Sequence, residues 1–477
     1  MRDPLALLPL ALGAADGRID GHPGAQLVAA GVTLLQRCAP LVRALAGRRA
    51  AILLPTGPHY VVALAAAEGR GAVLLNPLAA PPEIAHQCRD ADVGAVYTIG
   101  SLAEKLPPQL PVVLLDEAPR AARFVGPAGT RDIDLGSHVG LTLEGEIGVP
   151  GSPEEAAIVY TSAMAGVPLG AILTHGNLLA NARSTQEAAR TTADDHMLAL
   201  LPFSHLFGLT VSGLMPLLSG ARVTTMGRFH PVRALELLEQ GAITQLVGVP
   251  AVFIALLQVA LRRGGRVPLP ALRLAMCGGA PLDPAVQEQW ADVTGSELRQ
   301  GYGLTEAAPV CLFNDLDHAN IPGSLGRPFP GVEVSIRSVD TGVPHPAGVG
   351  GEIWVRGANV SPGYVSGNID GLARRDGWLR TGDIGVASAD GTVSFVGLVK
   401  PMFTRSGFNI YPRELERAIG ELPGVRSVQV AAIPEPSREH DILVDVTGDV
   451  TPEGVRRWCE HRLSSYKQPA DIRVNTV

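Results

Sequence analysis

The sequence is poor in the residues that mark secreted, zinc-binding or nucleic-acid-binding proteins. Its five cysteines are odd in number and form no CxxC pair, which argues against a disulfide framework or a zinc site and favours a cytoplasmic protein. Lys and Arg number 39 against 46 Asp and Glu, so the net charge is −7. Because no basic run is present either, we expect no nucleic-acid partner.

Long uninterrupted apolar runs are also missing. The apolar start at 5–15 contains a proline and follows an Asp-Pro pair, which suits a signal peptide badly. The segment 246–261 contains Gly248, Pro250 and Gln258, so it is predicted as a strand end, a turn and a buried helix, not as a membrane span. With 46% hydrophobic and 18% charged residues, the chain can bury a large core. We expect no membrane partner.

Lysine is scarce in this chain. Lys105, Lys400 and Lys467 are the three lysines, and every other basic residue apart from histidine is arginine. A basic position without a particular role is therefore expected to be arginine. A lysine that persists indicates a position of interest, and so does an aliphatic residue where a charge is expected.

The order of predicted elements indicates an α/β fold. Apolar segments at 50–54 and 71–75 alternate with helical patterns at 59–67 and 83–91. This alternation is typical of parallel sheets with helices on both faces. Further strands of this kind are predicted at 156–159, 222–225, 245–249 and 272–277.

The pattern changes beyond about residue 325. Short strands separated by glycine-rich turns are predicted at 332–337, 352–356 and 392–396, which indicates a small β-rich subdomain. A final α+β unit follows, with helices predicted at 411–419 and 452–463 and strands at 425–432 and 442–446. We therefore predict a large N-terminal domain of parallel α/β sheets over 1–399 and a small C-terminal lid domain over 400–477.

A series of motifs carries the chemistry. The turn Tyr160-Thr-Ser-Ala-Met-Ala-Gly-Val-Pro-Leu-Gly170 follows a predicted strand, and a turn of this composition can cradle phosphate with its backbone N–H groups. The motifs that follow are Leu201-Pro-Phe-Ser-His-Leu-Phe-Gly208, Cys277-Gly-Gly-Ala-Pro-Leu282, Gln300-Gly-Tyr-Gly-Leu-Thr-Glu306, Gly351-Glu-Ile-Trp-Val-Arg-Gly357, Gly377-Trp-Leu-Arg-Thr-Gly-Asp383 and Arg405-Ser-Gly-Phe-Asn-Ile-Tyr-Pro-Arg-Glu-Leu-Glu416. In this order, they resemble the AMP-forming acyl-CoA synthetase superfamily (the ANL adenylating enzymes) over essentially the whole chain.

The resemblance implies three groups of site residues. The nucleotide and cofactor side would be formed by Gly279, Ala280, Pro281, Tyr302, Gly303, Thr305, Glu306, Asp383 and Lys467. The acyl pocket would be bordered by His205, Val249, Gly301 and Gly303. The transfer step would use Lys400 as the lid hinge and Gly407 on the loop that lines the pantetheine tunnel of coenzyme A, with His205 as a candidate base for the thiol.

The resemblance also implies separate roles within the nucleotide group. Tyr302 would stack on adenine, Thr305 would bind the adenylate phosphate, and Asp383 would accept hydrogen bonds from the ribose hydroxyls. Glu306 would hold Mg²⁺, but only if a triphosphate binds.

The phosphate cradle departs from the family pattern. The family sequence is Ser-Gly-Thr-Thr-Gly-x-Pro-Lys-Gly, whereas this chain has Met164 and Ala165 in place of the two threonines and Leu169 in place of the lysine. The hydroxyls and the cation that would hold the β- and γ-phosphates are therefore missing. The preference of this chain for arginine does not explain an aliphatic residue at position 169.

The lid departs from the pattern as well. It begins Gly397-Leu-Val-Lys400, with Leu398 where the family has arginine. The family's catalytic lysine for adenylation lies beyond the Tyr-Lys-x-Pro element, and no lysine follows Lys467 in this chain. We interpret that catalytic position as absent; a shortened sequence is the alternative explanation for this one departure.

The departures predict a change of chemistry. ATP brings about four negative charges that a site must neutralise, and losing one such contact commonly costs about 10²–10³ in rate. An acyl-adenylate carries a single negative charge. Our hypothesis is an enzyme that transfers the acyl group of a preformed acyl-adenylate to coenzyme A and releases AMP, with a separate adenylating enzyme as supplier. In this it resembles the thioester-forming half of the split acyl-CoA ligase system of platensimycin and platencin biosynthesis, which implies a bulky diterpenoid acid and an antibiotic pathway.

Three alternatives remain open. The chain could be a complete ATP-dependent AMP-forming acyl-CoA ligase with an unusual cradle. It could be a catalytically dead module that binds nucleotide or acyl-CoA; the persistence of Thr305, Asp383 and Gly407 argues against that reading. The acceptor could also be the thiol of a carrier protein instead of coenzyme A.

Overall fold

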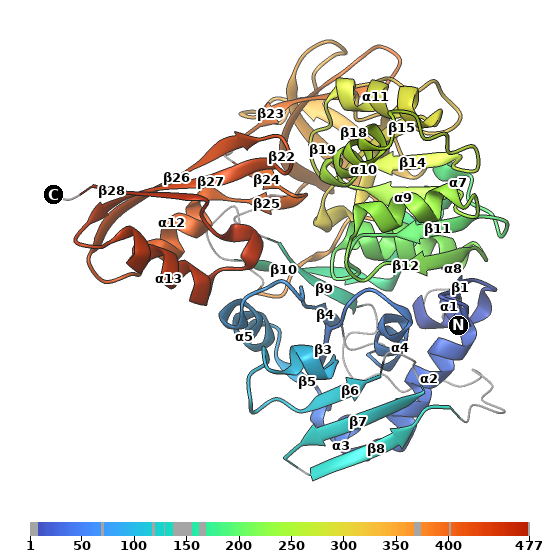
Figure 1. Cartoon of the computed structure of the whole chain (residues 1–477), viewed down its shortest axis with the longest axis vertical. Coiled ribbons are helices and arrows are strands. Elements are labelled where there is room, and N and C mark those ends of the chain that lie inside the picture. Colours follow the sequence, from blue (N-terminus) through green and yellow to red (C-terminus); the bar gives the residue numbers. More distant parts are fainter. Residues whose placement is uncertain are drawn as a thin grey trace.

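The computed structural model describes residues 8–67, 71–116, 120–127, 129–136, 155–161, 168–366, 374–399 and 402–475. Within them, most strands belong to two large sheets that lie one above the other in Figure 1, and the last part of the chain projects to one side. None of the helices in these ranges is long and apolar enough to cross a membrane.

The first large sheet has nine strands and a parallel centre. Its spatial order is β17 (Arg327–Pro328), β16 (Val310–Phe313), β15 (Leu298–Gly303), β14 (Leu274–Cys277), β13 (Gln245–Gly248), β11 (His196–Ala199), β12 (Arg222–Thr225), β1 (Arg18–Ile19) and β2 (His22–Pro23). The strands from β15 to β1 run parallel to one another, whereas β16, β17 and β2 are antiparallel to their neighbours.

The second large sheet is built in the same way. Its order is β20 (Gly363–Tyr364), β10 (Leu169–Thr174), β9 (Glu155–Thr161), β4 (Ala72–Leu74), β3 (Arg49–Leu53), β5 (Val93–Thr98), β6 (Val112–Leu115), β7 (Ala121–Gly126) and β8 (Gly129–Asp134). Strands β9 to β6 are parallel and the outer pairs are antiparallel. The prediction of parallel sheets therefore holds for the centres; the edges differ because chain-adjacent strands joined by short turns must run antiparallel.

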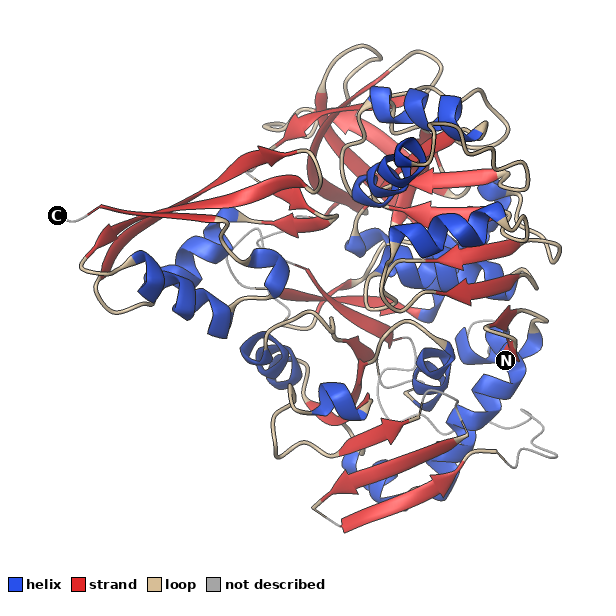
Figure 2. Cartoon of the chain, viewed as in Figure 1, coloured by secondary structure: helices blue, strands red, loops and turns tan. Residues whose placement is uncertain are grey.

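Helices cover both faces of each sheet, as the alternating pattern predicted (Figure 2). In β3, Ala50 and Ile52 pack in the core between the sheets, while Ala51 and Leu53 pack on the opposite face, as the two-residue period of a strand requires. The space between the sheets holds α2 (Gly24–Arg37), α4 (Pro58–Ala66) and α7 (His175–Ala189). The other face of the first sheet is covered by α9 (Pro231–Glu239), α10 (Pro250–Arg262) and α11 (Pro284–Thr294). The other face of the second sheet is covered by α5 (Pro81–Asp90). The shorter helices are α1 (Leu8–Ala14), α3 (Ala39–Ala44), α6 (Gly100–Ala103) and α8 (Met215–Leu218).

The β-rich subdomain is present as a third sheet. Its strands are β18 (Val332–Arg337), β19 (Gly351–Gly357), β22 (Trp378–Ala387), β21 (Arg374–Arg375) and β23 (Val393–Leu398). The short predicted strands at 332–337, 352–356 and 392–396 correspond to β18, β19 and β23. Strand β22 carries Asp383 from this sheet toward the end of β15.

The last part of the chain has a hydrophobic core of its own. It contains β24 (Phe403–Arg405), β25 (Phe408–Ile410), α12 (Pro412–Gly420), β26 (Val425–Glu435), β27 (Glu439–Gly448), α13 (Pro452–Arg462) and β28 (Asp471–Asn475). The sequence patterns missed β28 and the β24–β25 hairpin, and predicted β26 and β27 too short. Lys400 and Pro401 lie outside the described residues, so the boundary between 399 and 400 stays a prediction. We call residues 402–475 the lid.

Candidate functional site

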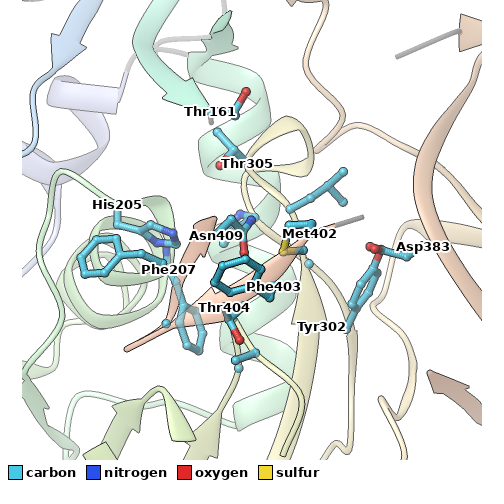
Figure 3. A pocket seen from close by; sticks show the side chains of 18 of the residues that line it. Thr161, His205, Phe207, Tyr302, Thr305, Asp383, Met402, Phe403, Thr404 and Asn409 are labelled. Atoms are coloured by element: carbon cyan, nitrogen blue, oxygen red, sulfur yellow. The ribbon is translucent and has the colours of Figure 1, made fainter. Parts of the chain in front are cut away.

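A cavity of about 850 Å³ lies where the lid meets both large sheets. Figure 3 shows side chains from widely separated segments around it, with His205 and Phe207 on one side, Tyr302 and Asp383 on the other, and lid residues between them. Most of the residues singled out from the sequence line it: His205, Gly279, Ala280, Pro281, Gly301, Tyr302, Gly303, Thr305, Glu306, Asp383, Gly407 and Lys467. The fold therefore gathers these positions at one place.

The end of β15 places Tyr302 beside Asp383. The Tyr302 hydroxyl donates a hydrogen bond to Asp383 Oδ2. Gly303 must be glycine here, because a Cβ would lie 2.0 Å from the backbone oxygen of Pro309. Burial raises the pKa of Asp383 to about 6, and the carboxylates of Glu306 and Glu352 add to the shift while the Tyr302 hydroxyl opposes it. The Asp383 carboxylate is therefore a strong hydrogen-bond acceptor with little to stabilise its negative charge.

Thr305 and Glu306 follow in a short 3₁₀ turn, η3 (Thr305–Ala307). Glu306 is buried, and its Oε1 accepts a hydrogen bond of 2.7 Å from the Tyr364 hydroxyl. Burial raises the pKa of Glu306, and this hydrogen bond opposes the shift. No group of three or more His, Cys, Asp or Glu side chains in the described ranges could hold a metal ion. A single carboxylate already engaged by Tyr364 does not fit a resident Mg²⁺, which needs further oxygen ligands.

The turn after β14 forms another wall of the cavity. Gly279, Ala280 and Pro281 line it, and Gly279 has φ +81, a left-handed conformation that favours glycine. The next helix, α11, begins directly after this turn: Asp283 accepts a hydrogen bond of 2.9 Å from the N–H of Ala285. This N-cap holds the end of the turn in place.

His205 lies on the opposite wall, just before the π-helical turn η2 (Phe207–Leu214). Its Nδ1 accepts a hydrogen bond of 3.2 Å from the N–H of Phe207, and burial lowers the pKa of the imidazole to about 4. A thiol has a pKa of about 8.5, so proton transfer from a thiol to His205 is strongly uphill. His205 is therefore a poor general base and a neutral part of the wall.

Val249 does not line the cavity as the structure describes it. It lies against two glycines, because a Cβ on Gly279 would be 3.5 Å from Val249 Cγ1, and a Cβ on Gly407 only 2.6 Å from it. Gly407 has φ +78 in the turn between β24 and β25. Val249 therefore marks the place where the lid loop meets the start of α10.

Lys467 is buried in a network that joins the lid to the second sheet. Its Nζ lies 2.9 Å from Glu83 Oε1 of α5 and 2.6 Å from Glu414 Oε1 of α12. Ser464 donates a further hydrogen bond to Glu83 Oε2. Burial lowers the pKa of Lys467, but Tyr466 and the two carboxylates outweigh it and raise the pKa above the usual value. Lys467 is therefore a charged side chain paired with two carboxylates.

The cradle turn joins β9 to the antiparallel β10, with Thr161 opposite Leu169. Thr161, Pro168 and Leu169 line the cavity. Met164 and Ala165, like the hinge residue Lys400, lie outside the described residues. Leu398 also lines the cavity, so the two aliphatic replacements that the structure describes both form part of its wall.

The charge around the cavity is negative. Of the described lining residues, Lys467 is the only lysine or arginine, against the three carboxylates of Glu83, Glu306 and Asp383. Because Lys467 is already paired with Glu83 and Glu414, this part of the wall offers no free cation to an anionic ligand.

Sequence reasoning missed three residues of this region. Glu83 had a local signal, since it stands three residues into a helix start and accepts a hydrogen bond of 3.0 Å from the N–H of Ala80. Tyr364 and Glu439 had none. Their importance comes from contacts with residues far away in the chain, with Glu306 in one case and Gly407 in the other.

Comparisons with known proteins agree with this geometry. The family model described as "AMP-binding enzyme" matches residues 40–365. A feruloyl-CoA synthase of Amycolatopsis is 33% identical, over 89% of this chain and 84% of its own. A solved malonyl-CoA ligase, a ternary product complex with methylmalonyl-CoA and AMP bound, is 25% identical with a TM-score of 0.79 and covers 98% of this chain and 96% of its own. ATP-bound MatB from Rhodopseudomonas palustris is 27% identical with a TM-score of 0.68, covering 100% and 93%.

Proposed function

Since this chain belongs to the AMP-binding enzyme family and is an acyl-CoA ligase of the AMP-forming type, we propose that it performs only the second half of that chemistry. In this proposal, it accepts a preformed acyl-adenylate, transfers the acyl group to coenzyme A and releases AMP. ATP-dependent adenylation is lost.

The charge of the cavity carries this proposal. A triphosphate needs several cations or oriented donors around it, but the single lysine or arginine among the described lining residues is neutralised by Glu83 and Glu414. Glu306 and Asp383 add negative charge within the same cavity. A singly charged phosphodiester-like adenylate is repelled far less than ATP.

The two aliphatic replacements support the same conclusion. Leu169 stands at the stem of the cradle and Leu398 at the end of β23, and both face the cavity. Each occupies a position where the family pattern has a cation. Because each replacement removes a charge from the wall of the cavity, it weakens the binding of a polyphosphate.

In this proposal, the transfer step makes few demands on charged residues. The thiol sulfur of coenzyme A attacks the acyl carbon, the new C–S bond replaces the C–O bond to phosphate, AMP leaves, and the thiol proton passes to solvent. The activated carbonyl already has a good leaving group, so orientation and exclusion of water suffice for most of the rate. Tyr302, Thr305 and Asp383 would hold the adenylate, and Gly407 would line the path of the thiol arm.

A paired turnover assay tests the proposal. One reaction contains the carboxylic acid, ATP, Mg²⁺ and coenzyme A; the other contains the synthetic acyl-adenylate and coenzyme A. We expect acyl-CoA in the second reaction alone, with stoichiometric AMP. Comparable rates in both would establish a complete ATP-dependent ligase, and no product in either, for a panel of aromatic, fatty and terpenoid acids, would favour the binding module.

The proposal implies a partner and a setting. An enzyme that cannot adenylate needs a separate adenylating enzyme as supplier, and a mixed anhydride is best passed on before water hydrolyses it. The apolar part of the lining, which includes Phe207, Met276 and Leu304, suits an apolar acid such as a diterpenoid acid of natural-product biosynthesis. Replacing coenzyme A by a phosphopantetheinylated carrier protein in the second reaction decides between the two acceptors.

A further inference from the structure

One residue of the lid has an unusual backbone conformation. Glu439 begins β27 with φ +65, in the left-handed region where side chains with a Cβ are disfavoured and glycine is preferred. It lies opposite Glu435 across the turn between β26 and β27. A strained glutamate at a position that suits glycine calls for a contact that the side chain makes elsewhere.

That contact is made to the turn of the lid that meets the large domain. Glu439 Oε2 accepts a hydrogen bond of 3.2 Å from the N–H of Gly407. Burial raises the pKa of Glu439, and the backbone N–H groups of Gly407, Ser406 and Ala251 oppose this shift. Ala251 is the second residue of α10, which belongs to the first large sheet. The carboxylate therefore faces the positive end of a helix dipole.

The loop around the carboxylate is shaped to receive it. Ser406 and Gly407 have φ +52 and +78. The N–H of Ser406 donates to the carbonyl oxygen of Arg438 at 3.1 Å, whereas the N–H of Gly407 points to the carboxylate of Glu439. The other oxygen, Glu439 Oε1, is buried with no hydrogen-bond partner among the described residues. The carboxylate thus fixes the tight turn of the lid whose Gly407 lies against Val249, the residue before α10.

We propose that Glu439 is a positioning residue for the transfer step: its carboxylate holds the 405–409 turn of the lid against the N-terminus of α10, and so keeps the lid where the thiol meets the acyl-adenylate. This inference rests on the proposed function, because it concerns the thioester step. An enzyme that has lost adenylation needs no second lid position, and a fixed lid then costs it nothing.

Replacing Glu439 by glycine separates this role from a purely structural one. Glycine accepts φ +65 without strain, so we expect Glu439→Gly to unfold at the same temperature as the parent protein or a higher one. We also expect kcat for acyl-CoA formation from the acyl-adenylate to fall about ten-fold, the effect of one charge-assisted hydrogen bond, with an unchanged KM for the adenylate. Glu439→Gln, which keeps the shape and loses the charge, should give a smaller loss.

Glu435→Gln is the matched control. Glu435 lies in the same turn, but its carboxylate accepts hydrogen bonds from the N–H and hydroxyl of Ser437, at 3.1 and 2.8 Å. This variant removes a carboxylate from the turn without touching the contact with α10. We expect its kcat to stay within two-fold of the parent value.

Hydrogen exchange of the full-length protein gives a second readout. Loss of the contact should speed exchange at two distant places in the Glu439→Gly variant, namely in the peptide with Gly407 and in the peptide with Ala251. A kcat within two-fold of the parent enzyme, or unchanged exchange at Ala251, overturns the inference. If the parent protein itself makes no acyl-CoA from the adenylate, the proposed function fails, and the exchange at Ala251 still decides whether Glu439 holds the lid.

Discussion

At the scale of single residues, the buried carboxylates determine which ligand the cavity can hold. Asp383 and Glu306 lie in one cavity, and burial raises the pKa of both. Each accepts a hydrogen bond from a tyrosine hydroxyl, Tyr302 for Asp383 and Tyr364 for Glu306, and neither forms an ion pair among the described residues. Such a site favours neutral donors, such as ribose hydroxyls, over further negative charge.

Asp383→Asn should stabilise the fold while it damages the site. The pKa of Asp383 is about 6 in the folded protein, above its unfolded value, so the folded state binds more protons between about pH 4 and 6 and its stability falls as the pH rises through this window. We expect the variant to gain up to about 2–3 kcal/mol at pH 7.5 and nothing at pH 3.5. Denaturant unfolding at both pH values measures the difference. An equal gain at both would contradict the role of the charge.

The same variant should bind the adenylate more weakly. The amide of asparagine keeps an acceptor for the Tyr302 hydroxyl but offers a weaker one to the ribose. We expect the KM for the acyl-adenylate to rise about ten-fold. An unchanged KM for the acyl-adenylate would show that Asp383 does not hold the nucleotide.

Leu169→Lys should return part of the affinity for ATP. Leu169 lines the cavity at the stem of the cradle turn, and a lysine there supplies one of the missing cations. We expect the dissociation constant of Mg·ATP, measured by calorimetry, to fall about ten-fold, while Leu169→Met leaves it unchanged. ATP binding by the parent protein as tight as that of an adenylate analogue would speak against charge as the limiting factor.

At the scale of elements, the site depends on how the β24–β25 hairpin meets the start of α10. Gly407 of the hairpin turn has a left-handed backbone conformation. It is also the point at which the turn comes close to Val249. Within the lid, the ring centroids of Phe408 and Tyr466 stack 4.2 Å apart, and the neighbouring Lys467 reaches Glu83 of α5. The lid is therefore held at both ends of its contact with the large domain.

Gly407→Ala should block this approach. Its Cβ would lie 2.6 Å from Val249 Cγ1 at a φ of +78, so the loop must withdraw. We expect kcat for the transfer step to fall at least about 30-fold, by more than 2 kcal/mol of transition-state stabilisation. Adding Val249→Ala should recover part of the loss, because it removes the atom that clashes.

Gly420→Ala provides the control for this experiment. Gly420 ends α12 and has no heavy atom within 4 Å of an added Cβ. Alanine at a helix end is tolerated or favoured, so activity should not change. Equal losses in both variants would point to the lid fold as a whole instead of the contact with Val249.

At the scale of the whole molecule, two sheets and a lid enclose one large cavity. The contacts that close it come from α5, α10, α12 and the turns of the lid. A ligand that fits between them binds the folded, closed form and stabilises it by mass action. Ligand-dependent stability is therefore a direct readout of which nucleotide the closed molecule accepts.

A non-hydrolysable acyl-adenylate analogue should raise the unfolding temperature, whereas ATP should not. At about 100 times its dissociation constant, a ligand contributes about 2.7 kcal/mol, which for a chain of this size corresponds to a few degrees. Thermal scans with the analogue, AMP and Mg·ATP measure the order. A larger shift with Mg·ATP than with AMP would contradict the proposed loss of triphosphate binding.

The sequence by itself determined the fold class, the order of the elements and most positions of the site. Alternating apolar segments predicted parallel sheet centres, because strand and helix periods are local properties of the chain. The replacement of expected cations by Leu169 and Leu398 was likewise visible without a structure, since it is a matter of residue identity. The antiparallel edges, β28 and the β24–β25 hairpin were not visible, because partner strands are chosen by packing.

Only the tertiary structure decided how the lid and the large domain meet. Lys467 and Glu83 are 384 residues apart in the chain, and Tyr302 and Asp383 are 81 apart. The contacts of Val249 with Gly407 and of Glu439 with the start of α10 are equally remote. Such pairings depend on how the lid and the large domain, each with its own hydrophobic core, pack against each other. The local sequence patterns that predict helices and strands carry no information about that packing. This is why the sequence indicated which residues form the site. The structure showed that the charge of Lys467 is already paired with Glu83 and Glu414.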